Sequence, residues 1–136
     1  MYKCNHFGIE ELVDPTTFEI LGEEAWKLFD PKALLAVDLL RETFGSCTIN
    51  SWKWGGNFQW SGYRSMKCTI GATKSMHRVG QAFDCKFKNI TAEEVRQAIK
   101  KDEAYWKQYI GRIENNVSWL HIDTKDMANA IRWFNP

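Results

Sequence analysis

Residues 75–87 read SMHRVGQAFDCKF and hold the features that decide how this chain folds. From Ala82 to Phe87 apolar and polar side chains alternate, which is typical of a strand with one buried face. Asp84 would face away from the core on this strand, opposite to Phe83, Cys85 and Phe87. His77 precedes Asp84 by seven residues with Gly80 between them, so the two cannot share a helical face. We therefore expect His77 on a loop that leads into the strand.

A second alternating segment lies well downstream, where residues 118–123 read SWLHID. Leu120 and Ile122 would point to the core of a strand in this segment. The opposite face would carry Trp119, His121 and Asp123. The two segments together therefore place Asp84, His121 and Asp123 on the outer faces of two strands, with His77 on the loop before the first strand.

Three of these side chains predict a metal site. Two imidazoles and one carboxylate are the ligands of a catalytic zinc, which keeps one coordination position for water. His77, Asp84 and His121 supply that set, so the sequence predicts a Zn²⁺ site. Either histidine alone would more commonly be a structural or surface residue. The third histidine, His6, lies outside both segments and is not expected to be a ligand.

The two segments also share a pattern, S-x-H-x-x-G-x-A-x-D followed later by W-x-H-x-D. This pattern resembles the zinc peptidases of the D-alanyl-D-alanine carboxypeptidase superfamily, the M15-like peptidases. That group includes D-Ala-D-Ala dipeptidases, phage endolysins that cut L-alanyl-D-glutamate bonds, murein endopeptidases and the Hedgehog signalling domain. The chain looks most like the short phage and bacterial branch, in which F-V-H-V-D-T precedes an Arg and a Trp. Here residues 121–124 read HIDT, and Arg132 and Trp133 follow.

The resemblance, which runs from about Leu35 to the C-terminus, implies roles for further residues. Arg64 in the run SGYR matches an arginine that relatives use to hold a substrate carboxylate or to stabilise the oxyanion. Its alternative role is a surface salt bridge. Ser75 could donate a hydrogen bond to substrate or only stabilise its own loop. Tyr63 and Gln81 are further candidates for binding substrate in the cleft.

The general base is the part of the site where the chain departs from its relatives. Peptide hydrolysis needs a group that takes a proton from water and passes it to the leaving amine. Relatives place an acid three residues before the last ligand or a histidine two before it, but Ser118 and Trp119 occupy these positions. Glu114 is the first candidate for the base. Asp123 is the second, although it could instead orient a ligand imidazole.

The remaining sequence predicts an α+β domain spanning residues 1–136. Asp30 and Pro31 begin a helix that ends at Phe44, and a capping box at Thr91 begins another that ends near Lys101. Further helices are expected at 22–29, 103–110 and 127–133, strands at 47–52, 82–87 and 118–123, and irregular segments at 5–15 and 111–117. The resemblance implies a small antiparallel sheet that carries the zinc site, with helices packed on it.

Composition limits the setting in which the protein works. A net charge of +1 and the lack of a Lys/Arg-rich block argue against nucleic acid as a partner. We expect no membrane span, and no secretory signal is evident at the start, so synthesis in the cytoplasm is expected. The four cysteines show no C-x-x-C spacing and are expected to be free thiols, although Cys4 and His6 could form a metal pair. A monomer is expected.

The resemblance thus implies a zinc-dependent peptidoglycan peptidase. It would hydrolyse an amide bond of the stem peptide or cross-bridge, next to a D-amino acid, and act on the bacterial wall after release from the cell, as a phage lysin does. Carboxypeptidase and endopeptidase activity both remain open. The alternative is a catalytically silent zinc-containing module that recognises the wall, or a virion structural component with the same fold.

Overall fold

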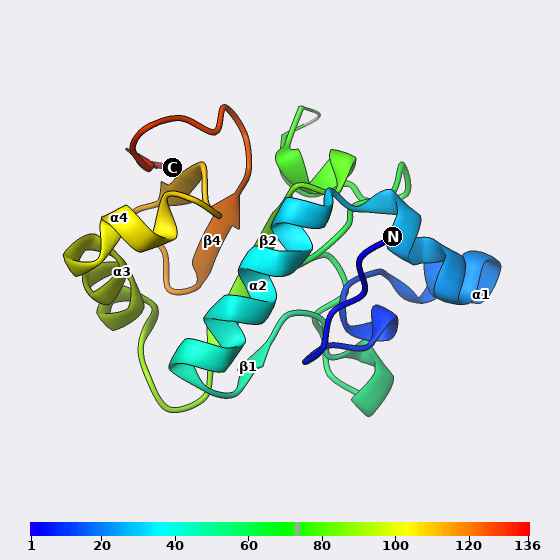
Figure 1. The fold of residues 1–136 in the computed structure, drawn as a ribbon. Helices are drawn as coiled ribbons and strands as arrows, with labels where there is room; N and C mark the ends of the chain where they lie inside the picture. Colours follow the sequence, from blue (N-terminus) through cyan, green and yellow to red (C-terminus); the bar gives the residue numbers. More distant parts are fainter. Residues whose placement is uncertain (73) are drawn as a thin grey trace.

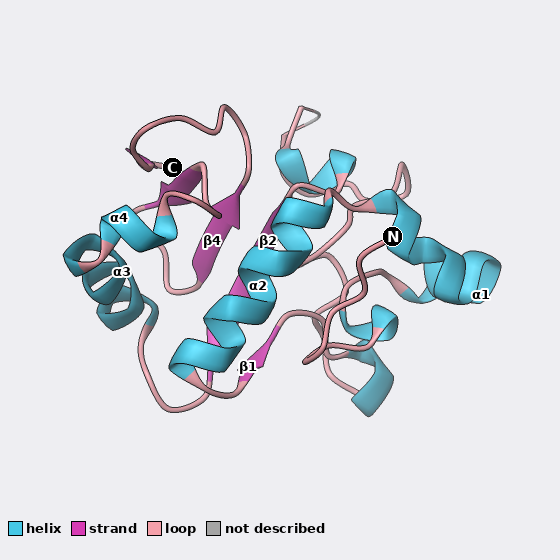
Figure 2. Cartoon of the chain, in the orientation of Figure 1, coloured by secondary structure: helices cyan, strands magenta, loops and turns pink. Residues whose placement is uncertain are grey.

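The computed structural model describes residues 1–72 and 74–136, and it has the α+β architecture that the sequence predicts (Figures 1 and 2). A five-stranded sheet has the order β1-β2-β4-β3-β5 and is antiparallel except between β3 and β5. Its strands are β1 (Cys47–Thr48), β2 (Ala82–Phe87), β3 (Arg112–Glu114), β4 (Leu120–Asp123) and β5 (Arg132–Phe134). Within the described residues, no helix is both long and apolar enough to cross a membrane.

The central pair of strands is the one that the sequence predicts. β2 and β4 run antiparallel, in a register that places Asp84 directly opposite His121. The inward side chains of β2 include Phe83 and Cys85, which are fully buried. Because side chains on a strand alternate, Asp84 is directed to the other face, beside its cross-strand partner.

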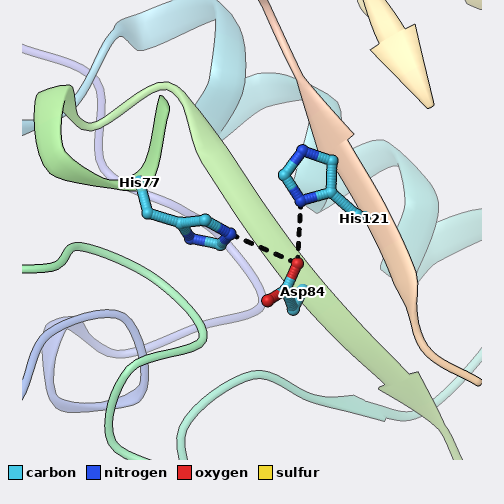
Figure 3. Close-up of side chains that lie close together, drawn as sticks. All are labelled: His77, Asp84 and His121. Atoms are coloured by element: carbon cyan, nitrogen blue, oxygen red, sulfur yellow. Dashed lines mark hydrogen bonds and ion pairs between the residues drawn. The ribbon is translucent and has the colours of Figure 1, made fainter. Parts of the chain in front are cut away.

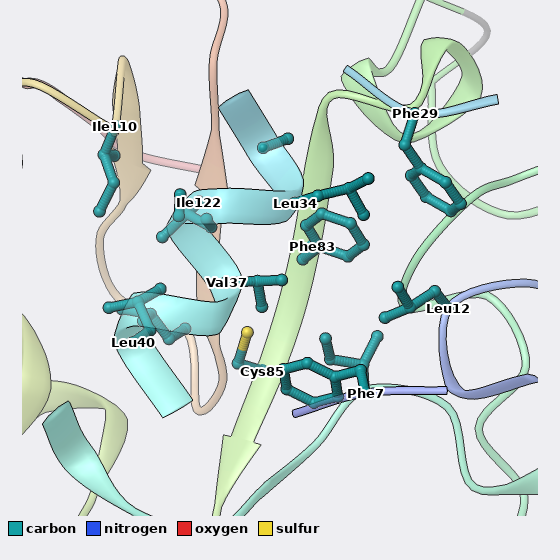
Figure 4. Packing of buried hydrophobic residues seen from close by; sticks show 14 of the residues in the cluster. Phe7, Leu12, Phe29, Leu34, Val37, Leu40, Phe83, Cys85, Ile110 and Ile122 are labelled. Carbon is teal, nitrogen blue, oxygen red and sulfur yellow. The ribbon is translucent and has the colours of Figure 1, made fainter. Parts of the chain in front are cut away.

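The longest helix, α2 (Pro31–Phe44), crosses the inner face of this strand pair (Figure 1). The Asp30 side chain accepts a hydrogen bond from the Lys32 amide, Pro31 fits the first turn, and Gly45 ends the helix with a φ of 93°. The core forms where the apolar face of α2 meets the sheet, as Figure 4 shows for Leu34, Val37, Leu40, Phe83, Cys85 and Ile122. This burial fixes β2 and, with it, the direction of the Asp84 side chain.

Two further helices, α3 (Ala92–Lys101) and α4 (Glu103–Trp106), lie on the side of the molecule that carries β4 (Figure 1). Thr91 and Glu94 form the expected capping box at the start of α3. Val95 and Ile99 enter the core from α3, and Trp106 does so from α4. Helix α3 also carries Arg96, a basic residue whose side chain is buried.

The N-terminal part is more regular than predicted. It holds α1 (Pro15–Leu21), which the sequence analysis did not predict, and the 3₁₀ helices η1 (Ile9–Glu11) and η2 (Gly22–Leu28). Two more 3₁₀ helices, η3 (Trp52–Trp54) and η4 (Met76–Val79), precede β2. The buried carboxylate of Asp38 on α2 ties down the start of the chain, because it accepts hydrogen bonds from Tyr2, Asn5 and His6.

The C-terminal third corrects two predictions. Residues 111–117 were expected to be a loop, but β3 forms within them because Ile113 is buried and pairs with Ile122. The helix expected at 127–133 is wrong, because Arg132 to Phe134 form β5 and pair with β3. An Ala-containing segment of this kind is compatible with helix, but pairing with a strand distant in sequence overrides that local preference.

The strand predicted at 47–52 is shorter than expected, since β1 ends at Thr48. Asn50 causes this break. Its amide and side chain bind the carbonyls of Glu11 and Val13, and its side-chain oxygen accepts a hydrogen bond from the Ser61 amide. Asn50 therefore connects three segments instead of extending β1. All four cysteines are free, and the Cys4 thiol donates to the Leu34 carbonyl.

Candidate metal centre

His77, Asp84 and His121 converge at one point, as the sequence predicts (Figure 3). His77 comes from η4, Asp84 from β2 and His121 from β4. Oδ1 of Asp84 lies 3.3 Å from Nε2 of His77 and 2.9 Å from Nδ1 of His121. One potential ligand atom from each residue lies within 4.8 Å of the other two. The side chains are 2%, 13% and 10% exposed, so the cluster is largely shielded from water.

The ring of His77 is oriented by the loop that holds it. Its Nδ1 lies 2.8 Å from the carbonyl oxygen of Gly62, and a carbonyl can only accept, so Nδ1 carries the proton. Gly80 closes η4 with a φ of 71°, where a Cβ would collide with the carbonyl oxygen of Leu28. Ser75 caps η4 by accepting a hydrogen bond from the His77 amide. These contacts direct Nε2 of His77 toward Asp84.

The ring of His121 is oriented from behind by Asp123. Its Nε2 lies 2.9 Å from Oδ2 of Asp123, a residue that is fully buried. Asp123 is held in turn by two side-chain nitrogens of Arg112, at 3.0 Å and 2.8 Å. This chain of contacts leaves Nδ1 of His121 directed at Asp84, an arrangement typical of metal-ligating histidines.

The donor and acceptor pattern calls for a cation between the three residues. A neutral His77 that donates through Nδ1 presents a lone pair from Nε2, and Asp84 faces it with a second lone pair. His121 has a carboxylate at each ring nitrogen, although a neutral imidazole carries only one proton. A metal ion at the point of convergence would satisfy all three groups at once.

The same contacts shift the ionisation of the cluster. Burial would lower the pKa of His121, but hydrogen bonds with Asp123 and Asp84 outweigh it and raise the pKa to about 9. Burial would raise the pKa of Asp84, but its contacts with His121 and His77 hold that pKa far below the ordinary range. Asp84 is therefore an anion, and His121 holds a proton that a metal would have to displace.

The distances fit a zinc ion. Zinc bonds of about 2.1 Å at tetrahedral angles place ligand atoms about 3.4 Å apart. The 3.3 Å between Asp84 and His77 is close to this value, and the 2.9 Å between Asp84 and His121 is shorter, as expected for a hydrogen bond that the metal would replace. The donor set of two nitrogens and one carboxylate oxygen also suits zinc, and three protein ligands are the number found in catalytic zinc sites. The residues present thus fit the metal that the sequence predicts.

The metal-ligand set opens onto a cleft of about 470 Å³. Six charged or hydroxyl-bearing residues line it besides the ligands, namely Arg64, Lys74, Ser75, Arg112, Glu114 and Lys125. Arg64 donates from one terminal nitrogen to Oδ2 of Asp84 at 3.3 Å and from Nε to the carbonyl of Trp60 at 2.8 Å. The three proposed ligands, a guanidinium and a carboxylate thus share one cavity, as amide hydrolysis requires.

A sequence model described as Peptidase M15 matches residues 9–123, a span that contains the three proposed ligands, Arg64 and Glu114. The chain belongs to this family. M15 peptidases are zinc metallopeptidases, so the family and the donor set point to the same chemistry. No curated protein and no solved structure matches the chain.

The two candidates for the general base, Glu114 and Asp123, occupy different positions relative to the cleft. Glu114 of this M15 peptidase lies on β3 and lines the cleft, and no side-chain hydrogen bond or ion pair of its carboxylate is found among the described residues. Asp123 lies behind His121 and not in the cleft. Burial would raise the pKa of Asp123, but contacts with His121 and Arg112 lower it. This geometry suits the orienting role that the sequence left open for Asp123.

Two predicted substrate contacts do not line the metal cleft. The Tyr63 ring packs edge-on against Phe29, with its centroid 6.2 Å away. Gln81 contributes its backbone to hydrogen bonds with Met76 and Thr124. Trp60 lines a neighbouring cavity, whereas the indole nitrogen of Trp52 donates a hydrogen bond to the carbonyl of Val13.

Sequence reasoning missed three basic residues of this peptidase site. Arg112 faces the cleft from β3 and holds Asp123, directly opposite it in the ladder. Arg96 is buried beneath the segment that carries Glu114 and Trp119. Lys86 shares the outer face of β2 with Asp84, and burial lowers its pKa to about 8. Lys86 had a detectable signal, since it lies two residues after a proposed ligand on an alternating strand.

Proposed function

We propose that this M15 peptidase is a zinc-dependent enzyme that hydrolyses an amide bond of the peptidoglycan stem peptide or cross-bridge, next to a D-amino acid. The single observation that carries the proposal is the convergence of His77, Asp84 and His121 at the floor of a cleft. The resemblance to wall-cutting members of the superfamily supports the choice of substrate. Its likeness to short phage and bacterial enzymes supports a lysin-like role, in which the protein meets the wall after release from the cell.

The chemistry divides between the metal and the chain. When bound, zinc supplies a Lewis acid that acidifies a water molecule and polarises the scissile carbonyl. Glu114 takes a proton from the attacking water and transfers it to the amine that leaves, so one C–O bond forms as the C–N bond breaks. Arg64 holds its guanidinium beside Asp84 and donates to the carbonyl oxygen as negative charge develops.

Contacts around Arg64 support this role. Its Nε is occupied by the Trp60 carbonyl, which fixes the plane of the guanidinium. One terminal nitrogen contacts Oδ2 of Asp84, so donors remain for a substrate oxygen in the cleft. The side chain is only 12% exposed, which strengthens its electrostatic effect on a group bound there.

The proposal is tested on purified peptidoglycan. Protein loaded with zinc is incubated with the wall material, and the release of new amino groups is followed over time. We expect release by the zinc-loaded wild type, none after a chelator removes the metal, and very little from Glu114→Gln. A wild type that binds one zinc ion and releases no amino groups from walls of several chemical types would refute the enzymatic proposal.

A second candidate is a zinc-containing module that recognises the wall without cutting it. The observation that favours it is the identity of Ser118 and Trp119, which stand where relatives carry an acid or a histidine. Glu114 separates the two candidates. In the module, Glu114→Gln leaves both wall binding and amino-group release unchanged, whereas in the enzyme it abolishes release and preserves zinc.

A further inference from the structure

The cleft continues beyond the metal ligands into a second space of about 270 Å³, which we call the aromatic lobe. Phe58, Trp60, Lys86 and Trp119 line it. Arg64 and Asp84 line both the aromatic lobe and the metal cleft, so a bound molecule can occupy the two at once. The lobe thus lies where one end of an extended substrate would run.

The alternation that presents Asp84 to the metal also presents Lys86 to the aromatic lobe. The two residues are separated by one on β2 and share its outer face. The register that pairs Asp84 with His121 places position 86 opposite position 119, and both line the lobe. Lys86 therefore lies on the same strand as Asp84, and Trp119 immediately precedes the strand that carries His121.

Lys86 is a cation without an acidic partner. Its ammonium donates to the carbonyl of Ile49 at 2.6 Å and to the hydroxyl of Ser61 at 2.7 Å, two neutral groups. The ring of Phe58 lies over it at 3.9 Å. Throughout residues 1–72 and 74–136, the ion pairs found involve other basic side chains. A half-buried ammonium fixed in this way attracts an anion from outside the chain.

The walls of the lobe are apolar and accessible. Phe58 is 48% exposed and Trp119 is 36% exposed, although large aromatic side chains are commonly covered in a folded chain. Rings on two sides of a cation form a site for a group that has an apolar body and a charged end. Such a site does not suit an uncharged apolar ligand, because Lys86 would then lose hydration without a partner.

We propose that the aromatic lobe binds a carboxylate-bearing part of the peptide substrate, with Lys86 paired to the carboxylate and Phe58 and Trp119 against the adjoining apolar atoms. This inference rests on the proposed function, because it assigns the substrate group held beside the reaction centre. A carboxylate of a stem peptide comes from one of two sources, an internal glutamate or the C-terminal residue. The lobe chemistry is the same for both.

The experiment uses zinc-loaded protein and four synthetic stem peptides of identical sequence. In one pair the α-carboxylate of the γ-linked glutamate is free or amidated, and in the other the C-terminal carboxylate is free or amidated. For wild type we expect kcat/KM to be about tenfold or more higher for the free acid of one pair, which identifies the source. Lys86→Met should reduce that ratio to about one, whereas Lys88→Met, a nearby exposed lysine, should leave it unchanged.

A second variant keeps the test decisive if Lys86→Met unfolds, since its loss leaves two buried oxygens without a donor. Phe58→Ala removes an exposed ring and should lower kcat/KM several-fold for all four peptides without abolishing the preference. Equal rates for acid and amide in both pairs would overturn the inference, as would a preference that persists in Lys86→Met. Failure of the proposed function looks different, because wild type then cleaves none of the peptides. In that case, calorimetric binding of the same four peptides tests the lobe by itself, with the same ratios expected.

Discussion

The three proposed metal ligands line the same cleft as Glu114 and Trp119, the two ends of segment 114–119, but the ligands and the segment are held in different ways. His77, Asp84 and His121 are positioned by paired strands and by partners behind them, such as Gly62 and Asp123. Segment 114–119 has less support from strands, because Glu114 ends β3 and pairs with Phe134 of β5 but residues 115–119 belong to no strand. It is held by Arg96, whose guanidinium donates to the carbonyls of residues 114, 117 and 119 at 3.5, 2.9 and 3.1 Å.

This difference separates two properties of the molecule. The metal-ligand set is built into the part of the sheet that the core stabilises, so metal binding should survive changes at segment 114–119. The proposed base, Glu114, and one residue of the aromatic lobe, Trp119, belong to that segment, so turnover should depend on it. Substitutions on the two sides should therefore affect zinc content and activity independently.

The largest expected effect comes from removing a ligand. His77→Ala leaves two protein ligands, so we expect loss of stoichiometric zinc and of measurable activity. The measurement is metal analysis of protein dialysed against low zinc, together with amino-group release from peptidoglycan. His6→Ala is the matched control, since His6 is exposed and lies outside the site. A His77→Ala protein that retains one zinc ion would break the assignment of the whole ligand set.

The next largest effect is expected from a change in segment 114–119. Glu114→Gln keeps the size and polarity of the side chain but cannot accept a proton from water. We expect amino-group release to fall by about 10²–10⁴-fold with zinc content unchanged. Glu19→Gln, at an exposed position of α1, is the control and should match wild type. Equal loss of zinc and activity in Glu114→Gln would mean that the two sides are not independent.

The two sides also differ in how far the sequence predicts them. The ligands were predictable because His77, Asp84 and His121 lie in or next to strands with clear alternation, and because α2 has strong start and end signals. These local patterns predict which side chains of β2 and β4 face the core and which face outward. The expectation that Asp84 and His121 share a face is confirmed by their direct cross-strand pairing.

The other side was not predictable from local pattern. β3 and β5 are three residues each, too short for alternation to be recognised, and they exist because they pair with each other and with β4. Arg96 looks like an exposed residue of an amphipathic helix, yet it is buried beneath three carbonyls from a distant segment. Its role depends on how the chain closes around it, which composition and spacing do not encode.

An intermediate effect is expected at the residue behind His121. Asp123→Asn weakens the acceptor at Nε2 and the pair with Arg112, so zinc affinity should fall by about 10–100-fold. Competition with a fluorescent chelator measures this affinity. Asp126→Asn is a suitable control, because Asp126 is exposed and has a φ of 50°, a conformation that Asn accepts well. Unchanged affinity in Asp123→Asn would show that the strands alone orient His121.

A smaller effect on activity is expected from Arg96→Met, which removes the donor to three carbonyls. The free energy of unfolding should fall by about 2 kcal/mol, because three backbone carbonyls lose a charged donor. We expect kcat/KM to fall by about tenfold, since a misplacement near 1 Å can cost up to about 10²-fold. Zinc affinity should stay within about threefold of wild type. Arg41→Met, at a half-buried position on α2, controls for the loss of a guanidinium.

The smallest effects are expected in the dependence on pH of two quantities. As the pH rises, the stability of the metal-free protein should fall and its affinity for zinc should increase. In metal-free protein the pKa of His121 is raised to about 9, above its ordinary value of 6.5, because it lies between Asp84 and Asp123. Folding therefore binds a proton between these values, and stability is full below about pH 6.5 and falls as the pH rises toward 9, by at most about 1.4 kcal/mol per pH unit. Denaturant unfolding at pH 6.5 and 7 measures this slope below the range in which Lys86, with its lowered pKa of about 8, contributes strongly in the opposite sense.

Zinc must displace the proton on His121, so its affinity should rise over the same interval, by up to about tenfold per pH unit. The difference in stability between the zinc-loaded and the metal-free protein should therefore grow as the pH increases. This difference comes from the proton on His121 and not from segment 114–119. Glu114→Gln should reproduce both slopes, because it leaves the contacts of His121 intact. If zinc affinity is flat between pH 6.5 and 8, His121 is neutral before the metal binds, and the cation that its two carboxylates require is the metal itself.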